Sequence, residues 1–169
     1  MAEETAIAIP DELERSFRSH HGLVFRTAYR ITGNAADAED VLQTVFLRLL
    51  HRSGDEPLQS EESYLRRAAI NAALDVLRSR QSDRTVELED LPSGHAHDHT
   101  AELRRALAQA LGKLEARSAE VFTLRFLEGF TNPEIARMLG ISQVLVAVIV
   151  HRTRRRLRKE LGASLGDRP

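Results

Sequence analysis

Apolar residues recur at intervals of three, four and seven along most of the chain, and this spacing limits the fold more than any other feature. In residues 11–31 they occupy one helical face, formed by Leu13, Phe17, Val24, Ala28 and Ile31. No segment alternates apolar and polar residues between turn signals, as a half-buried strand would. The sequence therefore predicts an all-α fold, with helices at residues 11–31, 36–50, 62–80, 101–114, 118–128, 132–139 and 142–161.

One segment opposes this prediction. Residues 144–150 read VLVAVIV, and β-branched side chains prefer strands to helices. In isolation the segment would be predicted as a strand. A helix is favoured because Ser142 can cap one and because apolar positions continue at helical spacing, at Val146, Val150, Thr153 and Leu157.

The composition changes between the third and fourth predicted helices. Residues 81–100 are rich in Ser, Asp, Glu, Pro, Gly and His and lack the apolar period needed to pack a core. We interpret this segment as an interdomain linker between a domain at residues 11–80 and a domain at residues 101–161. Residues 51–63 are expected to form a loop within the first domain.

Composition excludes several classes of function. The chain has no cysteine, which excludes disulfides, cysteine-based zinc sites and a thiol nucleophile. No apolar run approaches the roughly 20 residues that cross a bilayer, and the acidic start MAEETAIAIP lacks the basic flank of a signal peptide. We therefore expect a cytoplasmic protein without membrane insertion. Glycine-rich phosphate loops, zinc-protease pairs and dinucleotide fingerprints are absent, so neither an enzyme nor a cofactor is expected.

Three alternating histidines leave one enzymatic alternative open. His95, His97 and His99 could bind a transition metal, but no regular element is predicted to fix their geometry. A solvated linker is the preferred interpretation. A metal-dependent enzyme that uses this cluster is the competing class of function, and removal of the three histidines without functional loss would exclude it.

The clearest local signal for function lies in residues 131–142. Thr131 can cap a helix, Glu134 can return the hydrogen bond, and Pro133 is tolerated in the first turn. Gly140 permits a sharp turn after this short helix, and Ser142 can cap the next one. A helix, a glycine-containing turn and a second capped helix are typical of a helix-turn-helix motif.

The second helix of this motif carries the candidate DNA-binding residues. In a helix-turn-helix this element enters the major groove, and arginines along its later turns contact phosphates. The predicted core stripe leaves the opposite side to Gln143, Ala147, His151, Arg154 and Arg155. Basic residues crowd the end of the helix, at Arg152, Arg154, Arg155, Arg156, Arg158 and Lys159. The pattern predicts DNA binding; the alternative is a helical hairpin with a solvated, arginine-rich end.

Three segments resemble parts of one protein family. LEARSAEVFTLRFLEGFTNPEIARMLGIS (residues 114–142) resembles the carboxy-terminal promoter-binding domain of extracytoplasmic-function (ECF) sigma factors. DAEDVLQTVFLRLL (37–50) resembles the polymerase-binding helix of this family, and SYLRRAAINAALDVLRSR (63–80) its helix that recognises and melts the minus-ten element. The resemblance covers about residues 13–161. It implies a sigma region 2 helical bundle and a sigma region 4 helix-turn-helix domain, joined by a flexible linker.

The resemblance also implies partners and residue roles. A sigma factor directs core RNA polymerase to promoter DNA, and an inhibitory anti-sigma factor is a further partner that the resemblance allows. The clamp helices of the largest polymerase subunit would be contacted by Asp37, Asp40 and Gln43, although acids also favour a helix N-terminus. An unstacked base of the minus-ten element would be captured by the loop at residues 51–63 together with the residues that follow it, Tyr64, Arg67, Asn71 and Arg78.

The sequence departs from the family in the expected recognition helix. Minus-thirty-five contacts are implied for Ser142, Gln143, Ala147, His151, Arg152, Arg154 and Arg155. Polar or basic positions of the family are replaced by Leu145, Ala147, Val148 and Ile149. These side chains can touch thymine methyl groups but cannot hydrogen-bond base edges, so direct readout is expected to depend on Gln143, His151 and the arginines. An exposed apolar run invites association, so we expect the first domain, a second copy or an inhibitory partner to cover it.

A second departure and one alternative function complete the expectations. Ile70 replaces a basic residue that is frequent in the family, which predicts weaker or more selective melting. The alternative function is a sigma-like regulator that binds duplex DNA or protein without supporting initiation. A polymerase-dependent run-off transcript would favour the sigma factor, whereas binding to duplex DNA without polymerase would favour the regulator.

Overall fold

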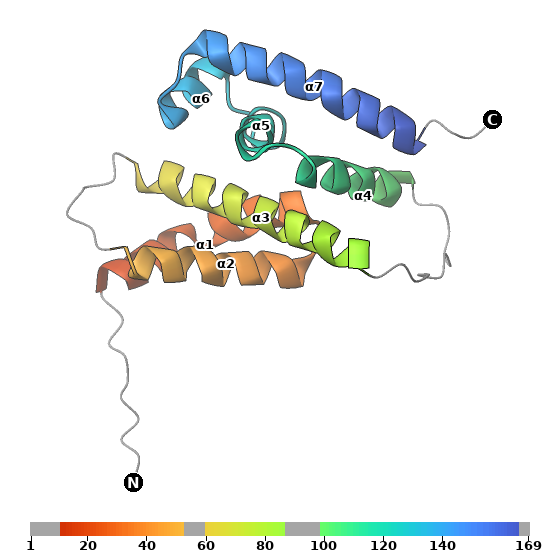
Figure 1. Cartoon of the computed structure of the whole chain (residues 1–169). Helices are drawn as coiled ribbons and strands as arrows, with labels where there is room; N and C mark the ends of the chain where they lie inside the picture. The colour runs from red at the N-terminus through yellow and green to blue at the C-terminus, as the bar shows by residue number, and fades with distance from the viewer. Residues whose placement is uncertain (1–10, 53–59, 87–98, 166–169) are drawn as a thin grey trace.

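Helices are the regular elements of the described part of the chain. A computed structural model describes residues 11–52, 60–86 and 99–165, arranged as in Figure 1. The first three helices are α1 (Asp11–Thr32), α2 (Ala35–Leu50) and α3 (Glu61–Val86). They are followed by α4 (His99–Gly112), α5 (Ala116–Phe122), a π-helical segment η1 (Thr123–Leu127), α6 (Asn132–Leu139) and α7 (Gln143–Leu165). The predicted all-α fold is confirmed.

The first domain is a bundle of α1, α2 and α3. Gly33, with a φ of 66°, ends α1. Asn34 then caps α2, because its side-chain oxygen accepts a 3.1 Å hydrogen bond from the backbone N–H of Asp37. Of the predicted apolar face of α1, Val24, Ala28 and Ile31 are buried. Buried apolar side chains of α2 and α3 complete this core, namely Ala38, Val41, Val45, Phe46, Leu65, Ala69, Ala72, Ala73 and Leu77. Phe17 was also placed on the apolar face of α1, but it is exposed.

The second domain comprises α4 to α7, and its helix-turn-helix forms as predicted. The Glu134 carboxylate accepts 2.7 Å hydrogen bonds from both the N–H and the hydroxyl of Thr131, at the start of α6. Gly140 follows α6 with a φ of 64°. The hydroxyl of Ser142 accepts a 3.1 Å hydrogen bond from the N–H of Leu145, which caps α7. α6 and α7 meet at a 109° bend.

The valine-rich segment at residues 144–150 is helical, as its cap and spacing predicted. Val146, Thr153 and Leu157 are buried, and α7 packs on α4, α5 and α6. The strand preference of the β-branched residues is overridden because one helical stripe is buried. α7 continues to Leu165, beyond the predicted end at 161. Among the described helices, none alone has the length and hydropathy to cross a membrane; α6 and α7 reach that threshold only as a bent pair.

A single predicted helix at residues 118–128 is divided in the structure. Its first part, α5, is capped by Glu115, whose carboxylate accepts hydrogen bonds from the N–H groups of Arg117 (3.1 Å) and Ser118 (3.2 Å). The N–H of Arg117 is the main cause that holds the pKa of Glu115 below its ordinary value. The second part, η1, has a wider π turn, in which the N–H of Glu128 donates to the carbonyl of Thr123 at 3.0 Å. The apolar spacing gave no signal for this turn.

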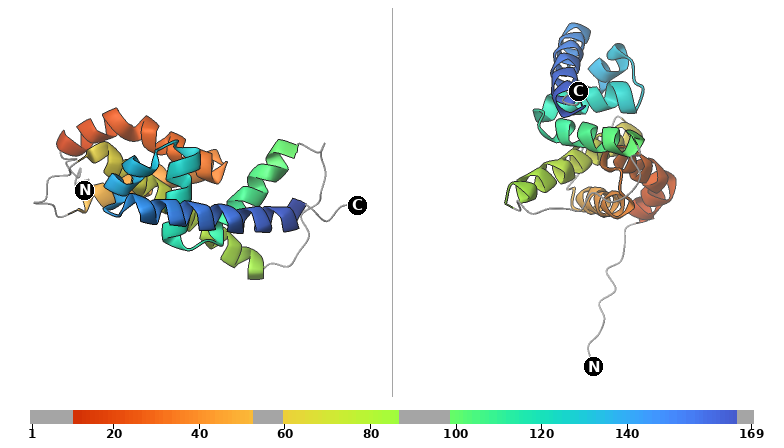
Figure 2. Two further views of the ribbon diagram at one scale, coloured as in Figure 1. Left: turned by 90° about the horizontal axis from the view of Figure 1, so that it is seen from above. Right: turned by 90° about the vertical axis from the view of Figure 1, so that its right-hand side faces the viewer.

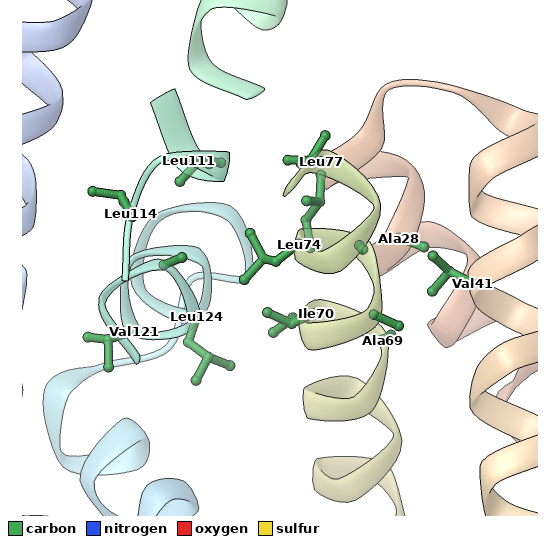
Figure 3. Close-up of a cluster of buried hydrophobic side chains, with 14 of the residues drawn as sticks. Ala28, Val41, Ala69, Ile70, Leu74, Leu77, Leu111, Leu114, Val121 and Leu124 are labelled. Atoms are coloured by element: carbon green, nitrogen blue, oxygen red, sulfur yellow. The ribbon is translucent and has the colours of Figure 1, made fainter. Parts of the chain in front are cut away.

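The two domains share one continuous hydrophobic core. In Figure 3, Ile70 and Leu74 point from α3 toward the second domain, whereas Ala69 faces α1 and α2. Ile70, Leu74, Leu111 and Leu124 are each no more than 1% exposed. α3 therefore packs on its own bundle with one side and on the second domain with the other. Ile70, which stands at a melting position by resemblance, is part of this core.

The predicted linker at residues 81–100 is only partly described. α3 extends to Val86, so the predicted helix end at Arg80 is too early, and α4 begins at His99. Residues 87–98, including His95 and His97, lie outside the described residues. Figure 2 shows the second domain lying across the first from two further directions.

Candidate nucleic-acid interface

The outer side of α7 brings together the residues predicted to contact DNA. Side chains exposed there are Gln143, Ala147, His151, Arg152, Arg154 and Arg155, with Ser142 exposed at the cap. The buried stripe through Val146 and Leu157 lies on the opposite side. All the predicted positions of this helix therefore face solvent in the described structure.

This side of α7 is strongly basic. His151, Arg154, Arg155 and Arg158 line one shallow depression on the helix surface. In the described part of the chain, none of these four side chains has a hydrogen bond or an ion pair. The first acid along α7 is Glu160, whose carboxylate lies 3.5 Å from Nζ of Lys113. The depression therefore offers uncompensated positive charge, as a surface that binds phosphates requires.

The first turns of α7 also expose apolar side chains. Val144 is 74% exposed, Leu145 45% and Val148 38%, whereas Ile149 and Val150 are half-buried. The expectation that the first domain covers this run is therefore wrong for the described residues. That a second copy of the chain or an inhibitory partner covers this run stays a prediction.

The residues predicted to bind the minus-ten element lie along α3, and the second domain contacts two of them. Nε of Arg67 donates a 2.8 Å hydrogen bond to the carboxylate of Glu120 in α5. Nδ2 of Asn71 donates to the same carboxylate at 3.4 Å. Arg67 also donates to the backbone carbonyl of Met138 at 3.3 Å. In this arrangement both side chains are engaged by protein.

The other two predicted residues of α3 have local partners. Tyr64 is half-buried, and the guanidinium carbon of Arg52 lies 5.4 Å from the centre of its ring. Arg78 forms a 3.0 Å ion pair with Asp75 on the same helix. Residues 53–59, which belong to the predicted loop before α3, lie outside the described residues.

A second carboxylate of the second domain is enclosed by the first. The side chain of Glu128 is fully shielded from solvent. It pairs with Arg30 at 3.0 Å and with Arg66, and it accepts a 3.3 Å hydrogen bond from the hydroxyl of Thr27. Arg66 also lies over the ring of Phe130, 5.2 Å from its centre. α1 and α3 thus supply two cations and a hydroxyl to one buried anion.

The predicted polymerase-binding residues divide into two environments on α2. Asp40 and Gln43 are exposed, whereas Asp37 is half-buried and forms an ion pair with Arg80 of α3. Leu47, 55% exposed, follows Asp40 and Gln43 on the same helical side. This surface of α2 therefore combines an acid, an amide and an apolar side chain.

Comparisons with known proteins decide the family. The Sigma-70 region 2 family matches residues 16–83, and the Sigma-70 region 4 family matches residues 104–157. An RNA polymerase sigma-E factor of Streptomyces avermitilis is 33% identical over 153 residues, which are 89% of this chain and 85% of that protein. The ECF RNA polymerase sigma factor SigM of Mycobacterium tuberculosis is 31% identical over 152 residues, 88% of this chain and 76% of that one. This chain belongs to the ECF sigma factors.

A solved structure agrees with this assignment. CnrH in complex with the cytosolic domain of CnrY is 27% identical to this sigma factor, with a TM-score of 0.53, over 89% of this chain and 88% of that chain. The two family matches fall on the first domain and on the helix-turn-helix domain. Together these findings identify a sigma factor, which directs RNA polymerase to promoters to initiate transcription.

Sequence reasoning missed the two glutamates that join the domains of this sigma factor. Both lie in the segment at residues 118–128, for which the sequence predicts a single regular helix. Glu120 stands four residues before the apolar, buried Leu124, and this spacing on one helical side was the available signal. Glu128 carried no signal, because its partners Arg30 and Arg66 lie far away in the chain.

A cavity of about 840 Å³ also lies between the domains. Its basic lining consists of Arg30, Arg80, Arg104 and Arg105, and apolar walls come from both domains, including Leu77 and Leu111. The cavity therefore depends on the packing of the two domains. Within the described residues there is no group of three or more His, Asp or Glu side chains that could hold a metal ion, but His95 and His97 fall outside those residues.

Proposed function

We propose that this sigma factor acts in the cytoplasm, where its two domains connect RNA polymerase to promoter DNA and catalyse no reaction themselves. Residues 11–80 would bind core RNA polymerase and the minus-ten element, residues 81–100 would link the domains, and residues 101–161 would bind the minus-thirty-five element. The observation that carries this proposal is the outer side of α7, where Arg154, Arg155 and Arg158 are exposed without protein partners in the described chain. An inhibitory partner is part of the proposal, because CnrH was solved in a complex with another protein.

The polymerase contact is proposed for the exposed side of α2. Asp40 and Gln43 supply polar groups to an arginine-rich partner surface, and Leu47 adds an apolar contact that the sequence did not suggest. Asp37 contributes differently, because its pairing with Arg80 already holds α2 against α3. Charged residues around an exposed apolar side chain are a common arrangement at protein interfaces.

The minus-ten contact requires a change of arrangement. Arg67 and Asn71 cannot reach DNA while Glu120 accepts their hydrogen bonds. We therefore propose that the second domain moves away from α3 when the sigma factor binds polymerase. Tyr64, Arg67, Asn71 and Arg78 would then form one open face for an unpaired DNA strand.

The test is transcription with purified core polymerase. The full chain and core enzyme are incubated with fragmented genomic DNA from the same source, and the transcript starts are sequenced. When the chain is present, we expect transcripts whose start sites lie downstream of one common pair of minus-thirty-five and minus-ten elements. Without the chain these transcripts should be absent. Binding to duplex DNA without any dependent transcript would support the regulator instead. Removal of His95, His97 and His99 should leave the transcripts unchanged.

A matched pair of variants tests the role of α7. The double substitution Arg154→Ala and Arg155→Ala should reduce promoter transcription at least about tenfold, because two phosphate contacts are lost. The control, Arg15→Ala with Arg18→Ala, removes the same charge from the exposed side of α1. Equal losses in both variants would mean that net charge, and not the α7 surface, determines promoter binding.

A further inference from the structure

The outer side of α7 begins with exposed apolar residues. Val144 is the most exposed large hydrophobic residue of the described chain, at 74%, and Val148 follows one turn later at 38%. Both lie opposite the buried stripe that contains Val146 and Thr153. The two valines therefore face solvent side by side.

Neither helix formation nor packing accounts for these valines. The hydroxyl of Ser142 already caps α7, and buried Val146 and Leu157 already anchor it. At exposed helical positions valine is a poorer helix former than alanine, leucine or the long polar residues. Exposed apolar side chains also favour association. We therefore look for a ligand that binds over Val144 and Val148, because neither valine stabilises the protein in the absence of a ligand.

The rest of this side of α7 indicates what the ligand is. Arg155 continues the line of Val144 and Val148 at helical spacing, and His151 and Arg158 flank it in the basic depression. No acid interrupts α7 before Glu160. An apolar protein groove would leave these cations without partners. Duplex DNA supplies phosphates for them and, in the major groove, the apolar C5-methyl groups of thymine.

We propose that Val144 and Val148 determine promoter specificity by contacting thymine methyl groups in the major groove of the upstream element. The inference rests on the proposed function, because it requires α7 to bind that element. Four residues advance about 6 Å along a helix, and base pairs are about 3.4 Å apart. The two valines therefore reach thymines in adjacent or next-but-one base pairs. Gln143 and His151, beside them, are free to hydrogen-bond base edges.

Methyl contacts give a defined but modest discrimination. Thymine differs from uracil only by its C5-methyl group, and covering one such group favours binding by about threefold to fivefold. Two covered methyl groups therefore favour the thymine-containing element by about tenfold to twentyfold. The upstream element that α7 reads is expected to contain thymines at two neighbouring positions.

The experiment removes only the methyl groups. Promoters are selected from a randomised library by transcription with the complete holoenzyme, and the best one is resynthesised with deoxyuridine in place of thymine in its upstream element. Run-off transcription at limiting holoenzyme is compared on the two templates. The variant carries Val144→Ser and Val148→Ser. The matched control carries Leu145→Ser, which alters an exposed apolar residue at 45% exposure that points to a different side of the helix.

The outcomes separate this inference from the proposed function. The wild-type and Leu145→Ser holoenzymes should lose about tenfold on the deoxyuridine template, whereas the double serine variant should transcribe both templates equally. Equal use of both templates by the wild type would overturn the inference and leave the sigma function intact. Discrimination that persists in the double variant would also overturn it. Absence of transcription from every template would overturn the proposed function itself, and this inference with it.

Discussion

Arg67 of α3 and Glu120 of α5, 53 residues apart in the chain, form a 2.8 Å ion pair that joins the two domains. Glu120 is buried, and Asn71 donates to the same carboxylate. The carboxylate thus accepts the hydrogen bonds that Arg67 and Asn71 would otherwise donate to DNA. A charge that suits a phosphate is here neutralised by the protein's own second domain.

Loss of the Glu120 charge should expose the predicted minus-ten face. In Glu120→Gln the hydrogen bond to Arg67 loses its ionic component, which is worth about 1–2 kcal/mol in a partly buried pair. The free sigma factor should then bind a labelled single strand of its minus-ten element about tenfold more tightly. Fluorescence anisotropy without polymerase measures this change.

The control for that variant is Glu102→Gln. Glu102 is an exposed acid of α4, so the substitution changes the net charge equally without touching the domain interface. Single-stranded DNA binding should rise far less in this variant. Equal affinity gains in the two variants would show that overall charge, not access to Arg67, limits binding.

Glu128 should matter mainly for stability. Its carboxylate is shielded from solvent and pairs with Arg66, whose side chain is 14% exposed, and with the more exposed Arg30. Glu128→Gln should lower the free energy of unfolding by about 2 kcal/mol, since Arg66 then loses its buried anion and keeps only the exposed carboxylate of Glu62 as an ionic partner in the described chain. Urea denaturation measures the difference. Glu14→Gln, which breaks the exposed pair with Arg18, should cost less than about 0.5 kcal/mol, and a similar cost for both would contradict this account.

The helices could be predicted because local signals and burial agree. The Thr131–Glu134 pair, Gly140 and Ser142 mark the helix-turn-helix in the sequence itself, and the same contacts stabilise it in the structure. The valine-rich start of α7 was predicted correctly for this reason. Its β-branched residues are weaker determinants than a cap and a buried stripe.

The contacts between the domains could not be predicted in this way. They join residues far apart in the chain, such as Arg66 and Glu128, and periodicity carries no information on such pairs. The buried side of α3 toward the second domain was also missed, since Ile70 and Leu74 lie off the stripe that packs on α1 and α2. The residues expected to bind DNA lie on the helices that the sequence predicted for them, and their contacts with DNA stay a prediction. The engagement of Arg67 and Asn71 by Glu120 had no signal in the sequence.

A side chain at Gly140, in the turn between α6 and α7, should lower the stability of the fold. Gly140 has a φ of 64°, and nothing lies within 4 Å of an added Cβ, so Gly140→Ala meets only backbone strain. We expect a loss of about 1–2 kcal/mol in the free energy of unfolding. Gly162→Ala is the matched control, because Gly162 lies in α7 with open space around it and alanine should gain about 0.5–1 kcal/mol there. Urea denaturation of both variants checks the opposite signs.

The exposed side of α2 should determine affinity for core polymerase. Asp40→Arg and Leu47→Asp should each weaken binding about tenfold or more, by charge reversal and by loss of an apolar contact. Competition with a labelled sigma factor for purified core enzyme measures this affinity. Glu12→Arg reverses another exposed acid of the first domain, on α1, and should bind normally. Unchanged affinity in both α2 variants would place the polymerase contact elsewhere.

The cap of α6 should make stability depend on pH in the acidic range. The hydroxyl of Thr131 and then its N–H donate to Glu134 and hold the pKa of that carboxyl below its ordinary value. A lowered pKa in the folded state means that the ionised form stabilises the fold. This contribution is complete above the ordinary carboxyl pKa and disappears as the pH falls through the lowered one. Wild type should therefore exceed Glu134→Gln in stability at neutral pH, and the difference should shrink on acidification.

Urea denaturation of both proteins between neutral pH and pH 3 tests this dependence, and the Thr131→Ala background supplies the control. Because the Thr131 hydroxyl is the largest cause of the lowered pKa, the stability difference between glutamate and glutamine at position 134 should vary less with pH in that background. A difference that stays constant with pH in the wild-type background would show that the hydrogen bonds to Glu134 do not depend on its charge.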